Sequence, residues 1–230
     1  MWKLTRPTRT ADETFQTCLL GVKDAALRVR LQGIKPTIIA AAHDYEVAAS
    51  TAVLYTLTPE NPVGTVTQVE MSRLYSGRMA KKGRPARPIY DELLNAATHG
   101  RCPLCGQRVV STLDHYLPHT VYPALAVSPQ NLVPCCADCN KAKHDRVATT
   151  EATQTLHPYF DDVEEDTWLQ ADVLVTTPAA VAFSVVSPLT WRAELTERVT
   201  THFKLMGLST LYSSHAAEEL SNIRHLMKGL

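Results

Sequence analysis

Apolar residues recur at nearly every third or fourth position in the first part of the chain. Between residues 12 and 31 their spacing is close to the 3.6-residue period of an α-helix. A second apolar stretch, residues 37–57, follows Pro36, and proline is well suited to the first turn of a helix. We therefore predict that roughly residues 10–60 are helical and that the turn-rich segment 58–65 is a linker.

The pattern of the remaining chain predicts a short helix, a hairpin and two final helices. The short helix is predicted over residues 89–100, since the glycine at its end suits a helix terminus. Two segments rich in β-branched residues, 167–177 and 180–187, predict short strands joined by a tight connection. Amphipathic helices are predicted at about 190–206 and 210–228.

The composition fits a soluble globular protein, with 45% apolar and 20% charged residues in a chain of 230. A chain of this length can bury a substantial core in one domain or two. The first residues, "MWKLTRPTRTADETF", contain no apolar run typical of a signal peptide, and no stretch of 18 apolar residues occurs. We therefore expect a cytoplasmic protein.

Charged residues are distributed unevenly, although the formal net charge is zero. Residues 71–146 hold 11 Lys and Arg against 5 Asp and Glu, a net charge of +6, and the rest of the chain has a net charge of −6. Within this zone, residues 71–90 carry six basic residues and no acidic one. Such a local field attracts polyanions, although a solvated basic loop is the alternative interpretation.

Two Cys-x-x-Cys pairs flank a 30-residue segment in the middle of the chain. Cys102 and Cys105 form the first pair, and Cys136 and Cys139 form the second. In a reducing compartment such pairs bind metal more often than they form disulfides, and together they supply four thiolates for a tetrahedral Zn²⁺. We predict a structural zinc site at these four cysteines, with Cys135 as an alternative to Cys136 that has a less regular spacing.

The segment between the cysteine pairs carries an Asp–His pair near the end of a predicted strand. Residues 109–113 have a strand pattern, and Pro118 indicates that the strand ends shortly after Asp114 and His115. Adjacent strand residues point to opposite faces, so one side chain can bind a hard divalent cation while the other activates a water molecule. The pair by itself is more typical of a capped turn than of a catalytic site.

Together with the motifs around it, this pair resembles the HNH endonucleases of the ββα-metal fold. The similar motifs are "LDHYLP", "NLVP" and "CNKAKHD", within residues 102–146, and the cysteine pairs resemble the zinc knuckles that flank many of these nucleases. The resemblance implies two strands and a helix around one divalent cation. The predicted fold is α+β: a mainly helical chain around a ββα-metal module with a four-cysteine zinc site, followed by a short C-terminal β-hairpin and helices.

The resemblance also implies roles for five residues of this segment. Asp114 and Asn140 would bind the catalytic cation, with His144, one helical turn after Asn140, as a third ligand. His115 would be the general base that takes a proton from the attacking water. Asn131 would brace the loop and orient His115 through its side-chain amide. Family members often have histidine where this chain has Asn140, whose amide oxygen suits Mg²⁺ or Mn²⁺.

The implied reaction is metal-dependent hydrolysis of a phosphodiester bond, with DNA as the first choice of substrate and RNA left open. No helix-turn-helix or other sequence-reading module is recognisable, so strong sequence specificity is not expected. With one active site per chain, double-strand cleavage would need a homodimer or two successive nicks. Basic residues near the module are predicted to contact phosphates: Arg78, Lys81, Lys82, Arg84, Arg87, Lys141 and Lys143.

The flanking segments resemble stand-alone bacterial HNH proteins, some of which act beside an ATPase in anti-phage systems of the Septu and retron-linked type. By this resemblance, the helical region 1–84 and the hairpin and helices of 151–230 would be docking surfaces. The nuclease module, 85–150, would then be gated by an ATPase partner.

Two other classes of function stay open. The first is a zinc-binding module that contacts nucleic acid or protein and has lost catalysis. All three residues at the centre of the resemblance, Asp114, His115 and Asn140, are present, which argues against such a loss. The second is a toxin-like nuclease with an immunity partner, which would normally be the end of a longer secreted chain.

Overall fold

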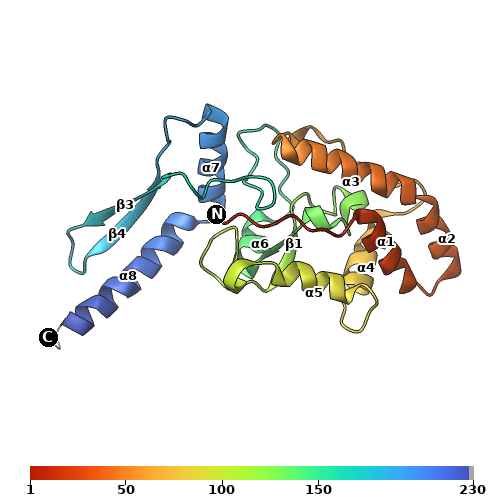
Figure 1. Ribbon diagram of the computed structural model, residues 1–230, viewed down its shortest axis with the longest axis horizontal. Coiled ribbons are helices and arrows are strands. Elements are labelled where there is room, and N and C mark those ends of the chain that lie inside the picture. Colours follow the sequence, from red (N-terminus) through yellow and green to blue (C-terminus); the bar gives the residue numbers. More distant parts are fainter. Residues whose placement is uncertain (228–230) are drawn as a thin grey trace.

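The computed structural model describes residues 1–227, and within that range the chain forms eight α-helices and two small antiparallel sheets (Figure 1). The helices are α1 (Ala11–Leu20), α2 (Ala25–Gly33), α3 (Lys35–Ser50), α4 (Gln68–Leu74), α5 (Arg87–Asn95), α6 (Ala137–Lys143), α7 (Ala193–Leu205) and α8 (Leu208–Met227). The strands are β1 (Thr112–His115), β2 (Leu132–Cys135), β3 (Leu169–Leu174) and β4 (Ala180–Val185). This confirms the predicted α+β class and its mainly helical character.

The predicted helical region near the N-terminus consists of three helices. Thr10 begins α1, and its side chain accepts a hydrogen bond from the backbone of Glu13 at 3.1 Å in a capping box. Asp24 begins α2 in a similar way, accepting from the backbone of Leu27 at 3.0 Å. Because Asp24 satisfies the free N–H groups of a new helix, the chain changes direction in the middle of a continuous apolar pattern.

A ββα unit occupies the middle of the chain. β1 and β2 pair antiparallel, with Asp114 opposite Val133, and α6 follows β2 directly and packs against β1. The predicted strand at 109–113 is shifted to 112–115, because residues 100–110 fold back on the first cysteine pair through the hydrogen bond from Cys102 N–H to the Arg108 carbonyl at 2.8 Å. The Asp–His pair therefore lies within the strand.

Buried side chains form three hydrophobic clusters. The first joins α1 to α5 with β1 and β2 and contains Phe15, Ile38 and Leu132. The second gathers the four cysteines of the predicted zinc site with residues of α7 and α8. The third surrounds Tyr45 and Tyr159. Each cluster draws on more than one of the three predicted regions, so the ββα unit shares its core with both flanks. The functional division into three regions stays a prediction.

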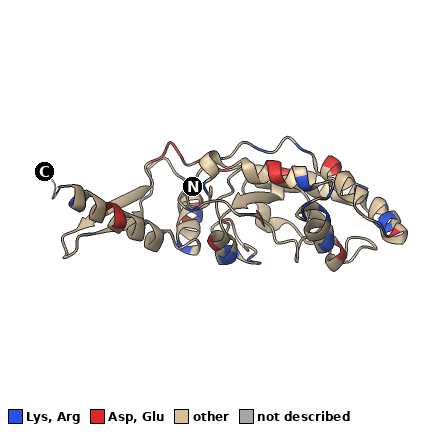
Figure 2. Cartoon of the chain, turned by 90° about the horizontal axis from the view of Figure 1, so that it is seen from below, with Lys and Arg blue, Asp and Glu red and all other residues tan. Residues whose placement is uncertain are grey.

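A hairpin and the last helix project from the body of the molecule (Figure 1). β3 and β4 pair antiparallel as the predicted hairpin, and α8 packs along β4. Acidic positions mark both α8 and the loop that precedes the hairpin (Figure 2). The predicted end of the last helix at 228 lies outside the described residues. None of the helices in residues 1–227 combines the length and the apolar character that a membrane span requires.

Candidate functional site

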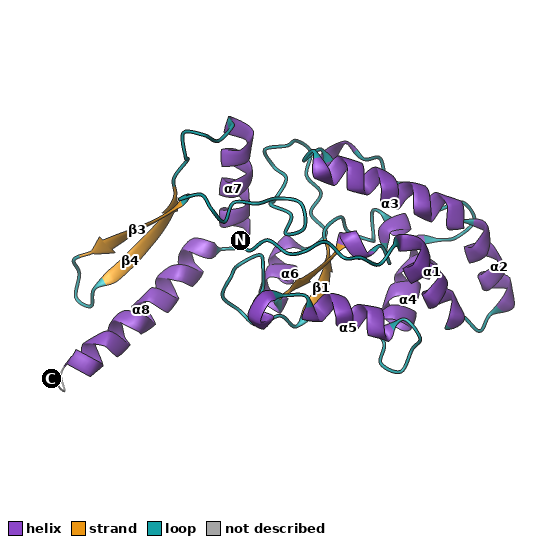
Figure 3. Ribbon diagram, in the orientation of Figure 1, coloured by secondary structure: helices purple, strands orange, loops and turns teal. Residues whose placement is uncertain are grey.

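A cavity of about 670 Å³ opens beside the ββα unit. Figure 3 shows β1 and α6 close together in this part of the fold. The cavity walls come from β1, the turn after it, α6 and the residues that follow α6. Five of the predicted site residues line it: Asp114, His115, Asn140, Lys141 and His144. Among the lining residues that were not predicted are three with aromatic, imidazole or carboxylate side chains: Tyr75, His119 and Asp145. The fold therefore gathers most of the expected polar groups around one open space.

His115 is buried, and its ring has a defined tautomer. Its Nε2 lies 2.8 Å from the carbonyl oxygen of Ala126, which can only accept, so Nε2 carries the hydrogen and donates it. The lone pair is then on Nδ1. Burial lowers the pKa of His115 to about 3, which keeps the imidazole neutral at physiological pH. The ring is thus in the protonation state that a general base requires.

Two aromatic side chains hold the His115 ring and were missed by sequence reasoning. Tyr75 meets it edge-on with ring centroids 4.5 Å apart, and the His119 ring lies 4.3 Å away. His119 is in a turn, and the turn at Pro118 brings its ring back against His115. The short spacing between His115 and His119 along the chain was the signal that could have identified His119 as a site residue. Tyr75 gave no local signal, because it reaches the site from a distant helical segment.

Asp114 is paired with a lysine inside the protein. The ammonium of Lys143 lies 3.3 and 3.1 Å from the two carboxylate oxygens and also donates to the His115 carbonyl at 2.6 Å. Burial raises the pKa of Asp114 to about 6, against the opposing effect of the lysine. Lys143 is only 4% exposed, so the prediction that it contacts DNA phosphates is wrong for this structure. Its side chain extends under α6 toward β1 and away from solvent.

Asn140 and His144 reach the same cavity by different routes. Asn140 is half-buried within α6. The helix ends at Lys143, and His144 follows it with φ 48° and ψ −148°, so the predicted shared helix face does not exist. The backbone N–H of His144 still donates to the Asn140 carbonyl at 2.9 Å, and both side chains line the cavity.

Asn131 is fully buried and acts on the loop, not directly on the histidine ring. Its amide oxygen accepts from the Leu117 N–H at 2.7 Å, and its amide nitrogen donates to the carbonyls of Leu117 and Leu125 at 2.9 and 3.3 Å. Because Ala126 is next in the chain, these bonds fix the carbonyl that holds His115. Asn131 therefore braces the loop as predicted, whereas His115 is oriented by a backbone carbonyl.

The four predicted zinc ligands converge on one point. The sulfur atoms of Cys102, Cys105, Cys136 and Cys139 all lie within 4.8 Å of one another, and all four residues are buried. Cys135 lies on β2 and is not part of this group, which decides between the two alternatives. Four convergent thiols suit a tetrahedral Zn²⁺. Cys136 also begins α6, where its sulfur accepts from the Cys139 N–H at 3.4 Å.

A family model described as HNH endonuclease matches residues 102–146, the range that holds both the cavity residues and the four cysteines. The chain is also 34% identical to protein ea31 of Escherichia phage lambda, over 97% of this chain and 79% of that protein. The chain belongs to the same family as protein ea31 and contains an HNH endonuclease domain. No solved structure matches the chain significantly.

The donors at the cavity of this HNH domain fit a hard divalent cation. Asp114 offers a carboxylate, Asn140 an amide oxygen and His144 an imidazole, a set that Mg²⁺ and Mn²⁺ accept. A carboxylate has about four lone-pair directions, so Asp114 can accept from Lys143 and still bind a cation. Three protein ligands would leave further positions to water and to a substrate phosphate, which Mg²⁺ commonly keeps.

The basic residues around the HNH domain differ in exposure. Three of the predicted phosphate contacts are exposed: Lys81, Lys82 and Lys141. Three are half-buried: Arg78, Arg84 and Arg87. Arg87 has partners within the protein, since its guanidinium pairs with Asp91 at 2.8 Å and lies 4.5 Å above the Tyr90 ring. Among the predicted contacts, a polyanion would therefore meet the three lysines first.

Proposed function

We propose that this chain is a metal-dependent endonuclease that hydrolyses phosphodiester bonds in DNA. The observation that carries the proposal is the geometry of His115. Its Nε2 is held by a backbone carbonyl, and it is buried and neutral beside the cavity that Asp114, Asn140 and His144 also line. These are the requirements for a general base next to a metal-bound phosphate.

In this mechanism the water that attacks the phosphorus gives its proton to Nδ1 of His115. The Ala126 carbonyl keeps the ring in position while the charge forms. The pKa of His115 is low in the free protein, and the negative charge of a bound phosphate raises it, so the base gains strength when substrate arrives. Asp114, Asn140 and His144 would hold a cation that stabilises negative charge on the phosphate and the leaving oxygen.

The test is cleavage of supercoiled plasmid with Mg²⁺ or Mn²⁺. His115→Ala should lower the rate about 10²–10⁴-fold, the usual contribution of a general base, and EDTA should abolish cleavage. His43→Ala removes an exposed histidine on α3 and is the matched control. Cleavage by His115→Ala at the rate of the control would contradict the assigned base. RNA in place of plasmid tests the other nucleic acid.

A non-catalytic zinc module is the second candidate, and one observation favours it. Both oxygens of Asp114 face the ammonium of Lys143, so the carboxylate is already neutralised inside the protein. A chain of this kind would bind DNA and retain zinc but would not cleave under any metal condition. Retained DNA binding without cleavage by the isolated chain would support this candidate or the need for a partner.

We further propose that regions 1–84 and 151–230 are docking surfaces and that an ATPase partner gates the nuclease in an anti-phage system of the Septu or retron-linked type. The similarity to protein ea31 extends over 97% of the chain, far beyond the HNH domain, which supports a role for both flanks. The proposal would be tested by co-purification of this chain with an ATPase encoded beside it, and by DNA cleavage that appears only when both proteins are present. Sedimentation would test the homodimer that double-strand cleavage suggests.

A further inference from the structure

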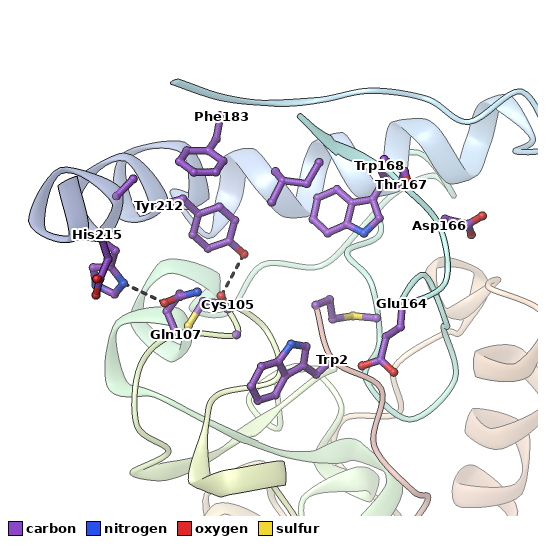
Figure 4. Close-up of a pocket in the computed structure, with 15 residues that line it drawn as sticks. Trp2, Cys105, Gln107, Glu164, Asp166, Thr167, Trp168, Phe183, Tyr212 and His215 are labelled. Atoms are coloured by element: carbon purple, nitrogen blue, oxygen red, sulfur yellow. Dashed lines mark hydrogen bonds between the residues drawn. The ribbon is translucent and has the colours of Figure 1, made fainter. Parts of the chain in front are cut away.

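A second cavity lies away from the HNH site, where the N-terminal segment, the first cysteine pair, the hairpin and α8 meet (Figure 4). Its volume is about 630 Å³, large enough for a long side chain or a short peptide segment. Of the residues that the proposed nuclease uses, only Cys105 borders it. Neither the HNH chemistry nor the family match assigns a role to this cavity.

Four aromatic side chains line the cavity: Trp2, Trp168, Phe183 and Tyr212. They are held in place by the surrounding chain. The Tyr212 hydroxyl donates to the Cys105 carbonyl at 3.0 Å, and its ring meets Phe183 edge-on with centroids 5.7 Å apart. The backbone N–H of Trp2 donates to the Pro103 carbonyl at 2.9 Å. A ligand would therefore meet two rings, Tyr212 and Phe183, that are already ordered, which lowers the entropic cost of binding.

The carboxylates beside these rings make the cavity acidic. Glu164, Asp166 and Glu219 line it, and no lysine or arginine is among the described lining residues. Met1 also lines it, and its α-ammonium offsets part of the charge of Glu164. Figure 4 shows Glu164 and Asp166 on one side of the space, across from Tyr212 and His215. Asp166 accepts one hydrogen bond from the Trp191 indole at 2.9 Å and so keeps a second oxygen for a ligand.

Aromatic faces and carboxylates both attract positive charge, the first through the ring quadrupole and the second through Coulomb attraction. We propose that this cavity binds an arginine or lysine side chain of a partner protein. A guanidinium stacks on aromatic rings and pairs with carboxylates, while the alkyl stem of either side chain packs against apolar walls. The proposal does not rest on the nuclease proposal, since no residue that acts in the hydrolysis is involved.

A nucleic acid base is the other ligand that aromatic rings commonly stack on. Here the charge opposes it, because the phosphates on either side of a base would approach three carboxylates. In the acidic loop leading to Trp168, Glu165 adds further negative charge, whereas Asp161 pairs with Arg198 and Asp162 pairs with Lys3. The basic zone 71–90 is the surface suited to a polyanion, and this cavity is suited to a basic protein segment.

Tryptophan fluorescence of the full zinc-loaded chain measures binding directly, since Trp2 and Trp168 line the cavity. The probe is the peptide acetyl-GRRGRRG-amide, compared with an acidic peptide of the same length, a short oligothymidylate and spermidine. We expect saturable binding of the basic peptide that weakens as salt rises. Tighter binding of oligothymidylate would identify a nucleic acid site, and tighter binding of spermidine a polyamine site. Either result would overturn the proposal.

Two variants test whether the fluorescence change reports peptide binding in this cavity. Glu219→Gln and Trp2→Leu should each weaken peptide binding about fivefold or more, the size expected for a lost ion pair or cation–π contact. Glu46→Gln removes an exposed carboxylate on α3 and should bind like the wild type. Circular dichroism and zinc content check the fold, and Glu219→Gln should cleave plasmid as the wild type does. Unchanged peptide affinity in Glu219→Gln would overturn the site even if Trp2→Leu fails to fold.

Discussion

Neighbouring residues on β1 have different partners but are both buried. His115 is held by the Ala126 carbonyl, and burial lowers its pKa to about 3. Asp114 faces the Lys143 ammonium, yet burial still raises its pKa to about 6. Both shifts favour the uncharged form, as expected where water is largely excluded.

The two lysines of α6 should respond very differently to the same substitution. Lys143→Met should lower the free energy of unfolding by about 3–5 kcal/mol, because it leaves a buried carboxylate without its counter-charge. Lys141 is exposed on the same helix, so Lys141→Met should change the free energy of unfolding by less than about 0.5 kcal/mol. This variant should, however, bind DNA more weakly and with a weaker dependence on salt concentration. Urea denaturation and DNA titration at several salt concentrations measure the two effects. Equal losses of stability would contradict the buried ion pair.

At the scale of elements, the cysteine cluster fixes how the ββα unit is assembled. Cys136 stands between β2 and α6 and is both a predicted zinc ligand and the residue that begins the helix. The first cysteine pair packs against α7 and α8 in the same buried cluster. A zinc ion here would therefore connect the helix that carries Asn140 with the C-terminal helices.

Zinc content distinguishes the ligands from the neighbouring thiol. Cys102→Ser should lose most of its zinc after dialysis, because three thiolates hold the ion far less tightly than four. Cys135→Ala removes an equally buried thiol outside the cluster and should keep one zinc per chain. Elemental analysis of both proteins measures the number of zinc ions per chain. Loss of zinc from Cys135→Ala with retention by Cys102→Ser would reverse the assignment.

At the scale of the whole molecule, two buried histidines join segments that are distant in the sequence. His157, before the hairpin, shares a hydrogen bond of 2.8 Å with the Tyr45 hydroxyl on α3. His202, on α7, donates from Nε2 to the Leu104 carbonyl in the first cysteine pair at 2.7 Å. Both are fully buried, and burial lowers the pKa of each, of His202 to about 4. They must therefore stay neutral in the folded protein.

Acid should destabilise the protein through His202. Its folded pKa is below the unfolded value of about 6.5, so the unfolded chain takes up the proton first as pH falls. The contribution of neutral His202 is complete above about pH 6.5, and about 3 kcal/mol of it should be lost between pH 6.5 and 4. His202→Gln keeps a donor for Leu104 without titrating. Urea denaturation at several pH values should show a weaker pH dependence in this variant, whereas exposed His43→Gln should follow the wild type.

The sequence by itself determined where most helices and strands lie and in what order the cysteine pairs and the HNH motifs follow one another. Helices and strands follow from the period of apolar residues, which is a local property, so the hairpin and the final helices were predicted close to their observed positions. The two cysteine pairs and the motifs around His115 are equally local, since their spacing along the chain carries the signal. Where a local signal was interrupted by a helix-capping residue such as Asp24, the prediction merged two helices into one.

Only the tertiary structure decided which groups meet and which are buried. Burial turned Lys143 from a predicted surface contact into the partner of Asp114. Packing brought Tyr75 and His119 against His115 and separated Cys135 from the four convergent thiols. Contact, desolvation and pKa depend on neighbours that are distant along the chain, and hydrophobic periodicity contains no information about those neighbours. The aromatic and acidic cavity beside α8 arises in the same way, from five segments that share no motif.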